Sequence, residues 1–269
     1  MLELLNSMGS DICLEENGML TIDSSNLTNP EARYELVKTM RASILVMGPL
    51  LAKYGRAKIS QPGGCNIGTR PIDFHLSGLE QMGAEIKIDS KFIYLEAKKL
   101  KPIDFSFPKI SVTGTENLIM AAIFTPGVTN LKNCAKEPEV VDLINFLNSC
   151  GAKIEGAGTS NISITGVEDL VGVDWNILPD RIEAGTYLVA GEITNGHVRI
   201  NNISDNLILP IITTLERMGV TIKKGKDWVE VDATTSDLKS VDIETGPFPG
   251  FPTDMQAQFM TLNCISDGS

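Results

Sequence analysis

A glycine-rich turn holds the residue with the clearest chemical potential in this sequence, the thiol of Cys65. The turn follows a predicted strand at 56–60 and reads Gln61-Pro-Gly-Gly-Cys65-Asn-Ile-Gly-Thr-Arg70-Pro-Ile-Asp73. Its glycines and prolines favour a tight, exposed loop in which the backbone can come close to a ligand. A free cysteine is usually a small buried hydrophobe. Here, however, Arg70 can lower the pKa of the thiol, so we predict that Cys65 is reactive.

Positive charge gathers around this turn, although the chain has a net charge of −11 at pH 7. The stretch 36–72 lacks Asp and Glu and contains Lys38, Arg41, Lys53, Arg56, Lys58 and Arg70. A solvated helix face is one explanation for such a run. Its position beside the cysteine turn favours a local anion site. The acidic balance of the whole chain argues against nucleic acid as a partner.

A second polar stretch precedes an apolar helix that we predict at 118–124. Residues 109–112 read as a strand, and a turn of small hydroxyl residues connects them to the helix. The amino end of a helix carries free N–H groups and a positive dipole end, which suit a diphosphate. An ordinary N-cap explains the hydroxyl residues equally well.

Asp254 is the candidate for proton transfer in the last helical segment. Thr253 and Gln256 flank it with the spacing of a capping box, which places Asp254 in the first helical turn. A carboxylate there either only complements the helix dipole or also accepts a proton from a bound hydroxyl.

The cysteines and histidines disfavour a metal site and a disulfide framework. The chain has five cysteines and two histidines, and no C-x-x-C pair. Cys13, Cys134, Cys150 and Cys264 fall on helix or strand patterns, so we predict structural roles for them. We therefore expect no metal and no cofactor.

A repeated unit must position these residues. Four segments share an apolar helix that ends at a glycine and is followed by a strand pair; the glycines are Gly9, Gly83, Gly151 and Gly219, separated by 74, 68 and 68 residues. Each glycine is predicted to adopt the left-handed conformation that ends a helix. A second helix followed by a strand is predicted at 36–60, 116–134 and 181–203. The period indicates modules of the βαβαββ type within globular domains.

The length of 269 residues favours two domains, which we place at 1–178 and 179–269. A fourth copy of the helix pattern begins at 251 and the chain ends before its strand, while the first copy begins directly in a helix. The repeat thus predicts that both domains are incomplete. No apolar run reaches the roughly 18 residues that span a bilayer, and the amino end lacks an export leader. We expect a cytoplasmic protein that does not enter a membrane.

Four stretches resemble the signatures of the UDP-N-acetylglucosamine 1-carboxyvinyltransferases, a family of enolpyruvyl transferases. They are YELVKTMRAS at 34–43, PGGCNIGTRPID at 62–73, LPDRIE at 178–183 and FPTDMQAQF at 251–259. The resemblance runs over essentially the whole chain. It implies an α/β fold of the inverted α/β barrel type, with two domains of repeated βαβαββ units. It also implies transfer of the enolpyruvyl group from phosphoenolpyruvate to the 3-hydroxyl of UDP-N-acetylglucosamine, which releases phosphate and begins peptidoglycan synthesis.

The resemblance also assigns roles to individual residues. Cys65 would protonate C3 of phosphoenolpyruvate and react with the epoxide fosfomycin, Asp254 would take the proton of the sugar hydroxyl, and Arg70 would face the phosphoenolpyruvate anion. The implied substrate contacts are Arg41, Arg70, Pro71, Ile72, Asp73, Phe74, Lys109, Ile110, Ser111, Val112 and Asp254. No protein partner is implied.

The family's Lys-Asn pair, which binds phosphoenolpyruvate, would precede Met1, and its late arginines would follow Ser269. We therefore expect an internal fragment with negligible turnover. Two alternatives stay open. One is another enolpyruvyl transferase, such as the shikimate-pathway enzyme, which shares the repeat but lacks the cysteine loop. The other is a protein that binds a nucleotide sugar without catalysis.

Overall fold

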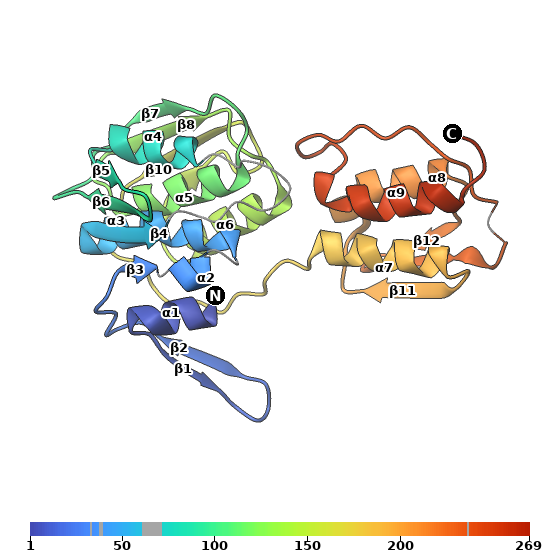
Figure 1. Ribbon diagram of the computed structural model, residues 1–269, viewed down its shortest axis with the longest axis horizontal. Helices are drawn as coiled ribbons and strands as arrows, with labels where there is room; N and C mark the ends of the chain where they lie inside the picture. The colour runs from blue at the N-terminus through green and yellow to red at the C-terminus, as the bar shows by residue number, and fades with distance from the viewer. Residues whose placement is uncertain (33, 38–39, 61–71, 236) are drawn as a thin grey trace. The chain divides into compact units, whose positions relative to one another are not determined.

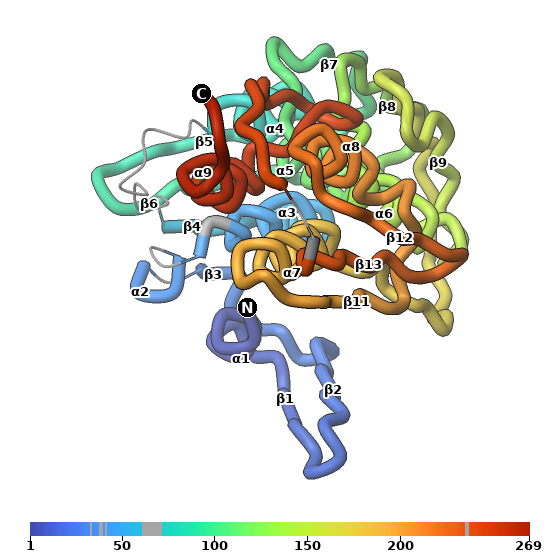
Figure 2. Tube along the Cα trace, turned by 90° about the vertical axis from the view of Figure 1, so that its right-hand side faces the viewer, coloured from blue at the N-terminus to red at the C-terminus, as the bar shows by residue number. Residues whose placement is uncertain are grey.

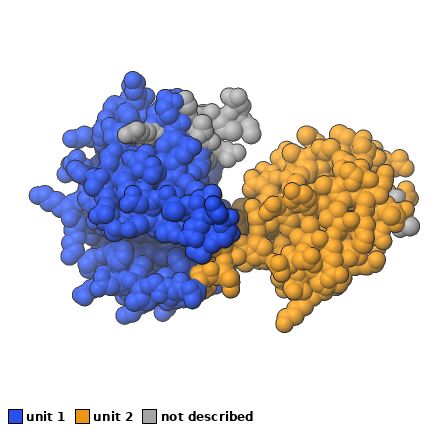
Figure 3. Space-filling model, turned by 90° about the horizontal axis from the view of Figure 1, so that it is seen from below, with its two compact units in different colours: residues 1–135, 143–174 blue, residues 136–142, 175–269 orange. Residues whose placement is uncertain are grey.

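The computed structural model describes residues 1–32, 34–37, 40–60, 72–235 and 237–269, which form two compact units (Figures 1 and 3). Unit 1 comprises residues 1–135 and 143–174, and unit 2 comprises residues 136–142 and 175–269. The domain boundary predicted after residue 178 stays a prediction. No helix within the described part of the chain is both long and apolar enough to cross a membrane.

The same chain reversal follows four helices, as the repeat predicts. The helices are α1 (Leu2–Met8), α4 (Asp73–Gln81), α6 (Pro138–Ser149) and α8 (Leu209–Arg217). The repeated glycine that follows each helix has a φ between 91° and 109°. The next backbone N–H bonds back to the carbonyl five residues earlier, for example from Ser10 to Leu5 and from Val220 to Leu215. This is the Schellman arrangement, and it requires glycine because a Cβ is disfavoured at positive φ.

Two sheets of unit 1 share one topology. The first has the order β3-β4-β6-β5, from Glu31–Ala32, Arg56–Ser60, Phe92–Glu96 and Glu85–Ile88. The second has the order β7-β8-β10-β9, from Asp104–Ser106, Val128–Lys132, Asn161–Thr165 and Lys153–Glu155. In each, the first pair is parallel and the other pairs are antiparallel. The predicted βαβαββ module and the α/β class are therefore confirmed, whereas closure into an inverted barrel stays a prediction.

Two apolar helices fill the interior of unit 1. Helix α3 (Met47–Tyr54) packs on β4, helix α5 (Val112–Ala122) packs on β10, and the two helices contact each other (Figure 1). A Cβ added at Gly48 of α3 would overlap the backbone oxygen of Asn117 in α5. A Cβ added at Gly78 of α4 would overlap Leu118. Glycine at these contacts allows the helix backbones to approach closely.

The amino-terminal part of unit 1 forms a separate hairpin. Strands β1 (Asp11–Leu14) and β2 (Leu20–Asp23) pair antiparallel and extend away from α1 (Figure 2). Both strands are largely exposed. The chain then passes through the short helix α2 (Tyr34–Val37) and the 3-10 helix η1 (Arg41–Val46), which leads directly into α3.

Unit 2 repeats the helix-and-sheet pattern. Helix α7 (Arg181–Ile193) packs on the sheet β11-β13-β12, from His197–Asn201, Trp228–Asp232 and Ile222–Lys224. The 3-10 helix η2 (Asp205–Ile208) precedes α8, η3 (Ala233–Thr235) follows the sheet, and η4 (Thr253–Met255) leads into α9 (Gln256–Ile265). The core includes Leu188, Ile212, Val229 and Phe259.

We predict that Gly48→Ala destabilises unit 1 by roughly 1–3 kcal/mol, because overpacking a close helix contact forces backbone shifts. Hydrogen exchange of the α3 and α5 amides measures the effect. Gly172→Ala is the matched control, since a Cβ there meets no atom within 4 Å. Equal protection in both variants would show that α3 and α5 do not pack as described.

We predict that unit 2 loses stability when the pH falls through the carboxyl range. His197 donates a hydrogen bond to Glu230 at 3.0 Å and, with Lys223 nearby, holds the pKa of Glu230 below its ordinary value. A hydrogen bond from Thr234 likewise lowers the pKa of Asp232. Because these pKa values are depressed in the folded state, their stabilisation is present above the unfolded pKa and disappears as pH falls through the folded one.

Fluorescence of Trp228, whose ring lies 3.8 Å from the Arg199 guanidinium, reports this sheet in a Trp175→Phe background. Glu230→Gln should lose less stability than the wild type on acidification. Glu216→Gln, at an exposed position in α8, is the control. The same acid loss in the Glu230 variant as in the control would contradict the prediction.

Candidate active site

The cysteine turn itself lies outside the described residues. Cys65, Arg70 and Pro71 fall within 61–71, so their predicted roles stay predictions. Arg41 is the first residue of η1, but its side chain is also outside the description. The strand predicted at 56–60, which leads into the turn, is confirmed as β4.

The chain leaves the turn by entering α4. Ile72 is the N-cap residue of this helix, and its carbonyl accepts the N–H groups of His75 and Leu76. Asp73 is exposed in the first turn, where a carboxylate complements the helix dipole, and Phe74 is half-buried beside it. The predicted substrate contacts Ile72, Asp73 and Phe74 thus share one helix end.

The second predicted binding stretch leads into α5, but its predicted secondary structure is wrong. Lys109 and Ile110 are exposed and outside any strand, and the helix runs from Val112 to Ala122 rather than over 118–124. The reason is a cap: the Ser111 hydroxyl accepts the Gly114 N–H at 3.1 Å, which starts the helix earlier. The structure thus shows a hydroxyl N-cap, whereas diphosphate binding at this helix end stays a prediction. The Ser111 cap leaves Lys109 and Ile110 at the helix entrance.

Two of these helix ends lie close together in unit 1. Thr113 Oγ1, next to Val112, is 3.3 Å from Nε2 of His75, next to Phe74. Asn117, one turn further along α5, contacts the other ring nitrogen of His75 at 2.9 Å. The sequence interpretation missed both His75 and Asn117. The available signal was an amide residue beside the apolar run at 118–124 and a histidine directly after the cysteine turn.

The lysines and arginines of the predicted positive patch have different structural roles. Lys58 forms an ion pair with Glu31 at 3.0 Å, and its ammonium lies 4.2 Å from the centre of the Phe92 ring. It therefore joins β3, β4 and β6 on the sheet surface. Lys53 and Arg56 are exposed. Within the described residues, Lys109 is thus an exposed cation beside a predicted ligand-binding helix end.

Asp254 lies in unit 2, on the exposed side of η4. The predicted capping box is wrong, because neither η4 nor α9 has a side-chain cap and Pro252 occupies the N-cap position. Packing holds this turn instead. The ring of Phe251 is buried edge-on against Phe259, with centroids 4.9 Å apart, and the Gly246 N–H bonds to the Phe251 carbonyl.

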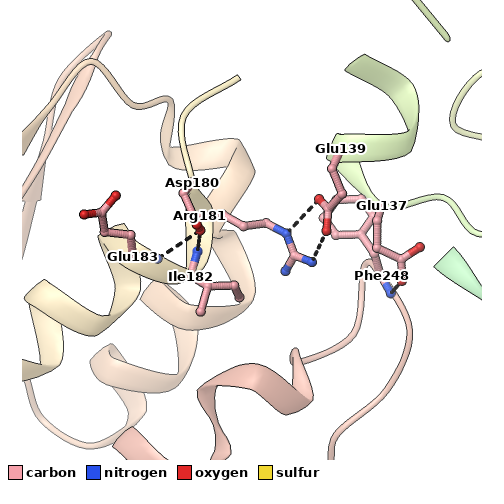
Figure 4. Close-up of polar contacts among 7 residues, drawn as sticks. All are labelled: Glu137, Glu139, Asp180, Arg181, Ile182, Glu183 and Phe248. Atoms are coloured by element: carbon pink, nitrogen blue, oxygen red, sulfur yellow. Dashed lines mark hydrogen bonds and ion pairs between the residues drawn. The ribbon is translucent and has the colours of Figure 1, made fainter. Parts of the chain in front are cut away.

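An acidic segment fixes the loop that precedes Asp254. Glu137 is 7% exposed and accepts the Phe248 N–H at 3.3 Å, while Glu139 receives a bidentate pair from Arg181 at 3.0 and 3.2 Å (Figure 4). Asp180 caps α7 by accepting the N–H groups of Ile182 and Glu183. The contacts of Glu137 and Glu139 attach segment 136–142 to the rest of unit 2. The sequence interpretation assigned no role to Glu137 or Glu139.

The described cysteines differ in exposure. Cys134 and Cys150 are buried, as their predicted structural roles require, and burial raises the pKa of the Cys134 thiol to about 12. Cys134 therefore stays protonated at neutral pH. Cys13 and Cys264 are exposed, so burial in the core does not support the structural roles predicted for these two cysteines. All four are free thiols.

Neither of two large cavities coincides with the predicted contacts. A cavity of about 480 Å³ in unit 1 is lined mostly by apolar side chains of α1, α3 and α5, and one of about 550 Å³ in unit 2 lies along α9. Neither is lined by a predicted site residue. Among the described side chains, no three His, Cys, Asp or Glu residues gather as metal ligands would.

Comparisons with known proteins agree on one family. The sequence model of the EPSP synthase (3-phosphoshikimate 1-carboxyvinyltransferase) family matches residues 1–269. The UDP-N-acetylglucosamine 1-carboxyvinyltransferase of Ruthia magnifica subsp. Calyptogena magnifica is 54% identical over 99% of this chain and 64% of that protein. The protein of the same name from Coxiella burnetii (strain Dugway 5J108-111) is 51% identical over 100% of this chain and 62% of its own length.

Solved structures show the same fold. The enolpyruvyl transferase NikO from Streptomyces tendae matches with a TM-score of 0.83 and 23% identity, over 99% of this chain and 64% of that one. EPSP synthase from Acinetobacter baumannii matches with a TM-score of 0.65 and 20% identity, over 98% of this chain and 60% of that one. The chain spans less than two thirds of the length of these relatives. Because the family model matches all of residues 1–269, the chain belongs to the EPSP synthase family, which confirms the resemblance to enolpyruvyl transferases recognised in its sequence.

Proposed function

We propose that this chain carries the reactive loop and the proton acceptor of an enzyme that transfers the enolpyruvyl group from phosphoenolpyruvate to the 3-hydroxyl of UDP-N-acetylglucosamine. The Cys65 turn carries the proposal, because the family's shikimate-pathway members lack this cysteine loop. The two relatives above, at 54% and 51% identity, bear the name of this transferase. The reaction would serve peptidoglycan synthesis in the cytoplasm.

The chemistry divides between an acid and a base. The sugar hydroxyl attacks C2 of phosphoenolpyruvate while its proton passes to the Asp254 carboxylate, and Cys65 donates a proton to C3. The resulting tetrahedral ketal then loses phosphate and a C3 proton, which restores the enolpyruvyl double bond. Arg70 stabilises the phosphoenolpyruvate anion by charge. Exposure of Asp254 in the first turn of η4 is consistent with a carboxylate that is accessible to a substrate.

The nucleotide sugar is assigned to the two adjacent helix ends of unit 1. The exposed ammonium of Lys109 and the first-turn N–H groups of α5 that Ser111 does not cap suit the diphosphate. Asp73, exposed at the start of α4, offers an acceptor for the donor groups of the nucleotide. The His75–Thr113 contact, which keeps these helix ends together, supports a single site.

We predict that UDP-N-acetylglucosamine binds this chain and that Lys109→Ala weakens binding by about tenfold, the loss expected for one charge-assisted contact. Isothermal titration calorimetry measures both affinities. Lys132→Ala is the matched control, because Lys132 is also an exposed lysine of unit 1 but lies on β8. Binding of shikimate 3-phosphate in place of the nucleotide sugar would favour the shikimate-pathway alternative. No binding by the wild type would contradict the site.

We predict that fosfomycin modifies Cys65 alone. The thiolate would attack an epoxide carbon and the ring oxygen would become a hydroxyl, so the mass increases by one whole fosfomycin molecule. Peptide mass spectrometry locates the adduct, and Cys65→Ser should abolish it. Cys134 and Cys150 are buried and should stay unmodified. Cys13 and Cys264 are exposed, so their labelling would reveal unselective alkylation. Equal labelling of Cys13, Cys65 and Cys264 would contradict a specific site at Cys65.

A further inference from the structure

Three stretches assigned to the nucleotide sugar begin three different helical segments. Arg41 opens η1, residues 72–74 open α4, and residues 109–112 lead into α5. In the sequence, more than 25 residues separate each of these stretches from the next. Binding one ligand with all three therefore requires a connection that fixes the relative positions of the helices.

Asn117 makes that connection at the centre of unit 1. Its side chain is fully buried, with a relative exposure of 0%. Its Oδ1 accepts the Gly48 N–H at 2.6 Å, and its Nδ2 donates to the Ile44 carbonyl at 3.2 Å. The same Nδ2 lies 2.9 Å from Nδ1 of His75. One amide of α5 thus binds the segment η1–α3 and helix α4.

These contacts favour one tautomer of the neutral His75 ring. The Gly48 N–H can only donate, so it must face Oδ1, which directs the amide NH2 group towards His75. An amide NH2 group can only donate, so Nδ1 of His75 must accept. The ring proton of the neutral imidazole then resides on Nε2, which donates to the Thr113 hydroxyl at 3.3 Å. His75 is 1% exposed, so water does not compete freely for these bonds.

We propose that Asn117 and His75 are positioning residues for the nucleotide-sugar site, a role that rests on the function proposed above. Three bonds of the network end near an assigned contact: Thr113 follows Val112, His75 follows Phe74, and Ile44 lies in the 3-10 helix that Arg41 opens. A buried polar network has only a few arrangements that satisfy all its donors and acceptors. This network therefore selects one relative placement of η1, α4 and α5.

Close helix packing lets the short amide side chain reach both neighbours. Gly48 lacks the Cβ that would overlap Asn117, and Gly78 lacks the one that would overlap Leu118. A glutamine at position 117 would be longer by one methylene group at a position that is 0% exposed. An aspartate keeps the shape, but replaces the donor NH2 by an acceptor oxygen.

Asn117→Asp is the test variant. The carboxylate still accepts the Gly48 N–H, but its other oxygen faces His75 Nδ1 and the Ile44 carbonyl without a proton to donate. We expect a proton to move to Nδ1 of His75, and the affinity for UDP-N-acetylglucosamine to fall by at least about tenfold as the helix ends shift. Asn148→Asp is the matched control, because Asn148 also bridges a backbone N–H and carbonyl, at 2.9 and 2.8 Å to Ile154 in unit 1.

Nitrogen-15 NMR spectra of the histidine rings show which ring nitrogen of His75 carries the proton. The chain has two histidines, and exposed His197 of unit 2 serves as an internal reference. The wild type should show an unprotonated Nδ1 at His75, and Asn117→Asp should show a protonated one. Asn148→Asp should leave the ring signals and the affinity as in the wild type. A merely structural role for Asn117 would lower the stability of Asn117→Asp but leave its affinity for the nucleotide sugar as in the wild type.

A conservative pair at position 113 provides a second readout if Asn117→Asp does not fold. Thr113 is only half-buried, so both substitutions should leave unit 1 folded. Thr113→Val removes the acceptor of the His75 proton and should weaken nucleotide-sugar binding, whereas Thr113→Ser restores the hydroxyl and the affinity. Equal affinities of the valine and serine variants would overturn the positioning role.

The two proposals fail in different ways. If the wild type does not bind UDP-N-acetylglucosamine, the proposed function is wrong. Hydrogen exchange then tests whether Asn117 and His75 fix the helix positions. Asn117→Asp should speed exchange in the first turns of α4 and α5, which Asn148→Asp should not. Wild-type binding together with an unchanged His75 tautomer and affinity in Asn117→Asp would instead overturn the positioning role and keep the function.

Discussion

The described architecture depends on one backbone constraint, the left-handed residue that ends a helix and returns the chain as a strand. Gly9, Gly83, Gly151 and Gly219 all have positive φ, where a Cβ would be strained. The Schellman bond that follows each glycine sets the direction of the next strand. Because the reversal is the same each time, successive sheets of unit 1 acquire the same strand order. Their interior helices α3 and α5 therefore occupy equivalent places in successive modules.

The interior of unit 1 combines this regularity with one polar exception. Apolar side chains dominate α3 and α5, and glycines at their contacts allow close packing. Asn117 and His75 are buried among them and satisfy each other together with backbone groups of η1 and α3. A buried polar group without partners is strongly unfavourable, so such groups restrict how their helices can pack. The same contacts bring the entrances of α4 and α5 together, where the predicted binding residues lie.

In unit 2, apolar packing and backbone hydrogen bonds hold the segment that carries the candidate carboxylate. Asp254 is exposed on a 3-10 turn that no side-chain cap stabilises. The turn is fixed by burial of Phe251 and, further back along the loop, by the bond from Phe248 to Glu137. Arg181 and Glu139 secure the same acidic segment by a bidentate pair, which adds directional specificity. The candidate carboxylate therefore remains accessible while the backbone that carries it is held.

The sequence by itself determined the repeat, the four helix-ending glycines, the strand at 56–60 and the family, because each depends on residue types at fixed short spacings. It also indicated an N-cap near this helix, but not that Ser111 would supply it and that α5 would begin at Val112. Only the tertiary structure decided that Thr253 and Gln256 form no capping box, that Lys58 pairs with Glu31, and that Asn117 meets His75. Arg181 and Glu139 are 42 residues apart and Asn117 and Gly48 are 69 apart. No local pattern specifies such pairs, because their geometry follows from how whole helices and sheets pack.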